Sequence, residues 1–166
     1  IVFTPTNVVI KGGGQTSLDL NNDGIVDFTI NQAFRSGHCF YYNVSISPAV
    51  NNGIIWGMVS PDGTWASALN AGDGVGNSQF FTSNLAILAV QNGGAGCPFQ
   101  HGGGYWVNIG PHYLGLSFVK NGKTHFGWAQ LNVQFVYFQR YQTLTTTMSG
   151  YAYETTSGKS IAAGKT

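Results

Sequence analysis

The residues in this chain best suited to chemistry are three aspartates grouped with two asparagines in one short segment. That segment runs from Asp19 to Asp27 and reads Asp-Leu-Asn-Asn-Asp-Gly-Ile-Val-Asp, a D-x-N-x-D-G-x-x-D pattern. Calcium is a hard cation that takes about six to eight oxygen ligands, and alternate residues of a tight loop can direct their oxygens toward one point. We therefore expect a structural Ca²⁺ site whose ligands are Asp19, Asn21, Asp23, Ile25 and Asp27.

The expected ligands would contribute in different ways. The first three would supply side-chain oxygens, Ile25 its main-chain carbonyl, and Asp27 would complete the shell directly or through water. Gly24 stands at the sixth position, where the chain must turn sharply. An EF-hand would continue to a glutamate at the twelfth position, which here is Ile30 within a strand-like segment. The alternative is an Asn/Asp-rich turn whose carboxylates accept main-chain amides.

Other motifs with catalytic associations lack the partners they need. The segment from His101 to Gly104 resembles the oxyanion-hole segment of lipases and esterases, but no G-x-S-x-G nucleophile elbow is present. The four histidines show no H-E-x-x-H spacing. Outside the aspartate-rich loop only Asp62, Asp73 and Glu154 remain as carboxylates, a poor basis for a glycosidase pair. We expect a protein that is not an enzyme.

Four tryptophans and eight tyrosines could form a platform for sugars, because flat aromatic faces suit the apolar faces of pyranose rings. Trp65 and Trp106 are the first candidates for ligand-facing aromatics, since glycine-rich segments surround them. The alternative is that these rings fill the core or form cross-strand pairs.

The elements that must position these residues are mostly strands. Short β-branched and aromatic runs alternate with Gly, Asn, Asp and Pro clusters, which predicts about ten short strands in one β-sandwich or jelly-roll domain spanning residues 1–166. Asn121-Gly122 between two apolar runs predicts a tight hairpin. Ser83 to Gln91 could form a short helix or another strand. Pro5 is expected to divide the segment Ile1 to Ile10 into two short strands, and the segment could pair within its own sandwich or be exchanged with a neighbouring subunit.

Charge and cysteine content limit the kinds of partner and the cellular compartment that we expect. Only 8% of the residues are charged and the seven Lys and Arg are scattered, which argues against nucleic acid, whose phosphates need clustered cations. No apolar run is long enough for a membrane span. Cys39 and Cys97 match no zinc spacing, so we expect one disulfide, with two buried thiols as the alternative. The start at Ile1 suggests a mature, secreted form.

Several segments together resemble a family of secreted bacterial proteins that often carry a C-terminal sorting segment. The matching segments are Leu18 to Ile30, Leu69 to Asp73, Tyr113 to Phe118, Gly122 to Leu131, Gly150 to Thr156 and Ile161 to Gly164. The resemblance implies an exported surface or matrix protein and brings no catalytic residues with it.

These observations favour an extracellular structural protein, a calcium-stabilised subunit of a surface filament, sheath or biofilm matrix. Low charge and many strands suit self-association through sheet edges. The alternative is a calcium-dependent carbohydrate-binding or adhesin module, whose partner would be a glycan.

Overall fold

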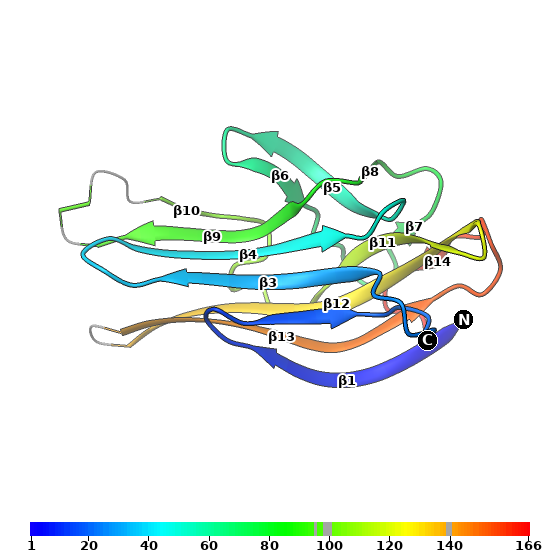
Figure 1. The fold of residues 1–166 in the computed structure, drawn as a ribbon, viewed down its shortest axis with the longest axis horizontal. Helices are drawn as coiled ribbons and strands as arrows, with labels where there is room; N and C mark the ends of the chain where they lie inside the picture. Colours follow the sequence, from blue (N-terminus) through cyan, green and yellow to red (C-terminus); the bar gives the residue numbers. More distant parts are fainter. Residues whose placement is uncertain (95, 98–100, 139–140) are drawn as a thin grey trace.

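The computed structural model describes residues 1–94, 96–97, 101–138 and 141–166, and these form an all-β fold (Figure 1). The described residues contain no helix. The strands are β1 (Val2–Ile10), β2 (Gln15–Leu18), β3 (Phe28–Arg35), β4 (Phe40–Pro48), β5 (Gly53–Ser60), β6 (Gly63–Ala66), β7 (Gly74–Val75), β8 (Phe81–Thr82), β9 (Ala86–Gly93), β10 (His101–Gly103), β11 (His112–Lys120), β12 (Lys123–Phe138), β13 (Tyr141–Tyr153) and β14 (Ile161–Ala162).

One large sheet dominates the molecule and curls back on itself, so that it is nearly barrel-shaped (Figure 1). Its strand order is β1-β13-β12-β11-β5-β6-β9-β4-β3-β2, antiparallel except between β6 and β9. β10 pairs with β9, β8 pairs with β5, and β14 and β7 form a separate small ladder. The two ends of the large sheet, β1 and β2, lie in contact.

The core lies between the two halves of this curled sheet. Alternating apolar residues of β3, β4 and β9 face those of β11, β12 and β13, as Ile30, Val44 and Leu131 illustrate with no exposed surface. A buried polar contact also joins the halves. The Gln32 side chain of β3 donates to the Leu144 carbonyl of β13, and its Oε1 accepts the Thr146 hydroxyl at 2.9 Å. Both polar ends of the buried amide are thereby satisfied.

The predicted all-β, sandwich-like architecture is confirmed, with more strands than expected. The predicted hairpin is present: Lys120 pairs with Lys123 across Asn121 and Gly122, which both have positive φ. Most of the segment Ser83 to Gln91 lies in β9, so it forms a strand and not a helix. Part of the glycine-rich segment from Asn92 to Gly104, residues 95 and 98–100, lies outside the described residues.

The N-terminal segment forms one long strand rather than two short ones. β1 runs antiparallel to β13 of the same chain, from the Val2–Tyr153 pair to the Ile10–Thr146 pair. The expected interruption at Pro5 takes the form of a β-bulge between Pro5 and Val8. The strand is therefore seated in its own sheet, and it occupies one end of it.

Candidate functional site

The aspartate-rich loop connects β2 to β3 and is organised by its own carboxylates. The Asp19 side chain accepts main-chain amides from Asp23 at 3.2 Å and Gly24 at 2.7 Å. The Asp23 side chain accepts the amide of Ile25 at 2.9 Å. Asn22 and Gly24 adopt positive φ angles of 58° and 87°, which lets the chain reverse within a few residues. The loop is therefore tight.

Asp27 lies at the base of the loop, where the chain enters β3. Its side chain is buried and accepts the Leu20 amide at 2.8 Å and the Asn52 side-chain amide at 3.1 Å. The pKa of the Asp27 carboxyl is raised overall, chiefly because the group is buried. The two hydrogen bonds lower the pKa, and the neighbouring carboxylates of Asp19 and Asp23 add a smaller increase. Asp27 anchors both ends of the loop through these bonds.

Asn21 provides the observation that bears most directly on a cation. Its Oδ1 atom is buried and has no hydrogen-bond partner. A buried acceptor without a donor costs about 1–3 kcal/mol, and a bound cation would remove that cost. The carboxylates of Asp19 and Asp23 already accept amides, but each carboxylate oxygen has two lone pairs and can also face a cation. The loop residues therefore fit a hard cation.

The three aspartates of the loop are not grouped as ligands of one ion, so a cation here would depend on other oxygens as well. Within the described ranges, no three His, Cys, Asp or Glu side chains are grouped as metal ligands. Amide and main-chain carbonyl oxygens, such as those expected from Asn21 and Ile25, are ordinary calcium ligands. The Ile25 side chain itself points outward and is 67% exposed. The hydrogen bonds within the loop also match the Asn/Asp-rich turn alternative, so the geometry accommodates both interpretations.

The loop is connected to the edge of the sheet. The Asn22 side-chain amide donates to the Thr4 hydroxyl of β1 at 3.4 Å, and its Oδ1 accepts the Tyr151 hydroxyl of β13 at 3.2 Å. The conformation of the loop and the position of the edge strand are thus coupled through one side chain.

The expected disulfide is present between Cys39, just before β4, and Cys97, after β9. A covalent link across 58 positions of sequence ties together the ends of two adjacent strands. The pairing removes the alternative of two buried thiols.

The two tryptophans expected to face a ligand do not reach the surface. Trp65 is 4% exposed and donates its indole N–H to the Ser60 hydroxyl at 2.7 Å. Trp106 is fully buried and donates to the Ala66 carbonyl at 3.1 Å. Trp106 lies in the main core and Trp65 in a separate buried cluster with Ile87 and Val90, and the indole N–H of each has a partner there. The expectation of a tryptophan platform was wrong.

The remaining motifs take structural positions. His101 to Gly103 form β10, paired with β9, rather than an oxyanion loop. His125 is buried and its Nδ1 lies 3.0 Å from the Glu154 carbonyl. The buried Glu154 carboxylate accepts the Thr156 amide and pairs with Lys159 at 3.0 Å. These interactions lower the pKa of Glu154 to about 2, so it stays ionised as a structural anchor.

Sequence reasoning missed two features. The first is Asn52, which holds Asp27 and also accepts the Val119 amide at 3.0 Å. The second is a row of side chains from Arg35, Tyr41 and Asn92 beside the disulfide. Neither had a local signal: Asn52 looks like an ordinary turn residue, and the row exists only once β3, β4 and β9 are paired.

Comparison with known proteins adds no assignment, since no family model, curated protein or solved structure matches this chain. The part of the chain that the structure describes contains no helix with the length and hydropathy to cross a membrane.

Proposed function

We propose that this chain is an extracellular structural protein, a calcium-stabilised subunit that assembles through its sheet edge into a filament, sheath or matrix layer. The observation that carries the proposal is β1, a nine-residue strand at the end of the large sheet. An edge strand presents unpaired main-chain groups and acts as a template for another chain.

The edge lacks the charges that usually protect such strands. Neither β1 nor β2 contains a charged residue, and Val2, Phe3 and Val9 of β1 are each at least 40% exposed. Soluble proteins commonly place lysines on exposed edges to prevent pairing. The protective features on β1 are Pro5, the adjacent bulge and a limited contact with β2. An uncharged apolar edge of this length supports assembly between copies.

Calcium enters the proposal through the loop beside this edge. A cation held by Asp19, Asn21, Asp23, the Ile25 carbonyl and, directly or through water, Asp27 would offset the repulsion of the aspartates and satisfy the buried Asn21 oxygen. Because Asn22 contacts Thr4, a stiffened loop would also hold β1 in place. In this proposal, bound calcium keeps β1 in the position that a neighbouring copy pairs with. The disulfide fits an oxidising, extracellular compartment.

Electron microscopy of the negatively stained protein, with calcium and again with chelator, tests the proposal. Ordered filaments or sheets in calcium that disperse on chelation are expected. Dispersed single particles in both conditions would contradict it.

A second candidate is a calcium-dependent carbohydrate-binding or adhesin module. It cannot use Trp65 and Trp106, which are buried. What favours it is the cavity beside the disulfide, lined by an arginine, a tyrosine and an asparagine. Binding of a glycan by dispersed particles would support this candidate over assembly.

A further inference from the structure

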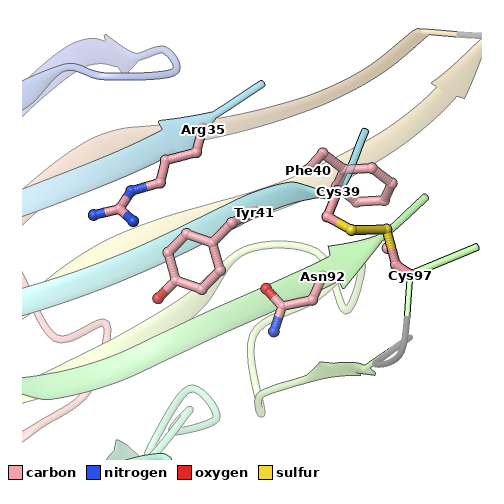
Figure 2. A pocket seen from close by; sticks show the side chains of 7 residues that line it. Arg35, Cys39, Phe40, Tyr41, Asn92 and Cys97 are labelled. Atoms are coloured by element: carbon pink, nitrogen blue, oxygen red, sulfur yellow. A yellow bond between two sulfur atoms is a disulfide. The ribbon is translucent and has the colours of Figure 1, made fainter. Parts of the chain in front are cut away.

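The cavity beside the disulfide lies on the face of the sheet opposite the core. It measures about 590 Å³ and opens at the ends of β3, β4 and β9. Figure 2 shows Arg35, Tyr41 and Asn92 projecting to one side from these three neighbouring strands, with the Cys39–Cys97 disulfide at the edge of the cavity. A volume of this size is in the range of small-molecule sites, which is about 300–1,000 Å³.

Strand register places the three side chains in a row. Arg35 is directly opposite Tyr41, and Tyr41 is directly opposite Asn92. Residues directly opposite each other in an antiparallel pair share a face of the sheet. The next residues along, Phe34 and Tyr42, stack at 4.7 Å on the other face, and Tyr42 contributes to the core. The row therefore faces outward.

The walls of the cavity are fixed before any ligand arrives. Tyr41 packs against a small outer cluster of Trp65, Ile87 and Val90. The disulfide ties the ends of β4 and β9 together. Gly93 must lack a side chain, because a Cβ there would lie 2.6 Å from the Phe40 ring. A preformed site loses less conformational entropy when it binds.

Each member of the row calls for a particular chemical group. Among the described residues that line the cavity, Arg35 is the one that carries a charge, and its planar fork matches a carboxylate in a bidentate manner. The flat ring of Tyr41 suits the apolar face of a pyranose. The Asn92 side chain lines the cavity beside them, and its amide group can exchange a hydrogen bond with a sugar hydroxyl.

We propose that this cavity binds a pyranose bearing a carboxylate, a uronic acid residue of an acidic polysaccharide. The Arg35 guanidinium pairs with the carboxylate, Tyr41 lies against the ring, and Asn92 exchanges a hydrogen bond with a hydroxyl. The proposal gives the carbohydrate-binding candidate its ligand class. It does not depend on assembly through β1, because β1 contributes no described residue to the cavity.

Calorimetric titration of the oxidised protein with galacturonate and glucuronate trisaccharides, at one fixed calcium concentration, tests the proposal. We expect saturable binding of at least one trisaccharide, and binding about tenfold weaker or absent for its methyl ester, which keeps the shape and removes the charge. Arg35→Gln should weaken binding about tenfold and Arg35→Lys less, because lysine keeps the charge but loses the fork. Lys11→Gln, which removes an exposed cation outside the cavity, is the matched control and should bind normally.

Amide NMR shifts locate the ligand without relying on any variant. Shifts of Arg35, Tyr41 and Asn92 should move together as the trisaccharide is added, while those of the aspartate-rich loop stay in place. The assignment is overturned by an absence of binding at millimolar sugar, by equal binding of the methyl ester, by an unaffected Arg35→Gln protein, or by tighter binding of a sulfated, carboxylate-free trisaccharide.

Discussion

Asn52 donates its side-chain amide to both the main-chain carbonyl and the carboxylate of Asp27, at 3.1 Å in each case. Its own oxygen accepts the Val119 amide at 3.0 Å. One buried asparagine between β4 and β5 thus joins the start of β3 to the end of β11. The position of the aspartate-rich loop depends on a residue outside it.

Replacing Asn52 should therefore destabilise the protein strongly. Asn52→Ala leaves the buried Asp27 carboxylate with one fewer donor and the Val119 amide without its acceptor, at a cost of about 2–4 kcal/mol. Urea unfolding at pH 7 measures the loss. The control is Asn77→Ala, which removes an exposed asparagine with one 3.4 Å bond and should cost about 0.5 kcal/mol or less. Equal losses in both variants would show that Asn52 is not an anchor.

Calcium should stabilise the wild-type protein through the loop. At about one hundred times the dissociation constant, a single bound ion adds about 3 kcal/mol, which corresponds to a rise in melting temperature of about 5–10 °C for a chain of this size. Asp23→Ala should lower the melting temperature and remove the response to calcium and to chelator. Differential scanning calorimetry provides the measurement.

Asp73→Ala is the matched control for the calcium experiment. Asp73 is also a turn aspartate that accepts a main-chain amide, from Asn70 at 2.7 Å, but it lies outside the loop. Its removal should lower stability while the calcium response persists. A calcium response that persists in Asp23→Ala would contradict the assignment of this loop as the calcium site.

Glu154 should give the protein part of its acid sensitivity. Its pKa is lowered to about 2 by the Thr156 amide and Lys159, from an ordinary 4.5, so the folded state favours the ionised form. The stabilisation is complete above pH 4.5 and is lost as pH falls from there through about 2. Because Lys159 is 62% exposed and water screens the ion pair, this contribution is about 1–2 kcal/mol.

The Glu154→Gln variant isolates this contribution. In calcium-free buffer the wild-type protein should exceed the variant in unfolding free energy by about 1–2 kcal/mol at pH 7. That difference should shrink steadily as the pH falls from 4.5 toward 2, because the wild-type carboxylate then becomes protonated too. Denaturant unfolding at several pH values measures it. A difference that stays constant with pH contradicts the linkage.

The sequence predicted features that depend on local pattern. The all-β fold, the turn at Asn121 and Gly122 and the tight conformation of the aspartate-rich loop follow from residues adjacent in the chain. The Cys39–Cys97 disulfide followed from counting cysteines. Residues 86–90 were ambiguous because Ala-Ile-Leu-Ala-Val is buried on both faces of the sheet, and such a run has no period of two.

Features that depend on the pairing of distant strands could not be predicted from the sequence. The row of Arg35, Tyr41 and Asn92 needs β9 to lie beside β4, although β5 to β8 intervene in the chain. The burial of Trp65 depends on which face of β6 it occupies, and that of Trp106 on where its turn packs, and glycine-rich neighbours encode neither. Asn52 has no local signal, because its partners are 25 and 67 positions away.

The central claim, assembly through an uncharged sheet edge, is tested most directly by placing a charge on β1. Val9 is 48% exposed on that strand, so Val9→Lys should leave the fold intact and repel a neighbouring edge. Val50→Lys adds the same charge in the turn after β4, where Val50 is 87% exposed. Analytical ultracentrifugation in calcium should show large assemblies for the wild-type protein and Val50→Lys, and monomers for Val9→Lys. Assemblies of unchanged size in Val9→Lys, or a wild-type protein that sediments as a monomer, would contradict the account.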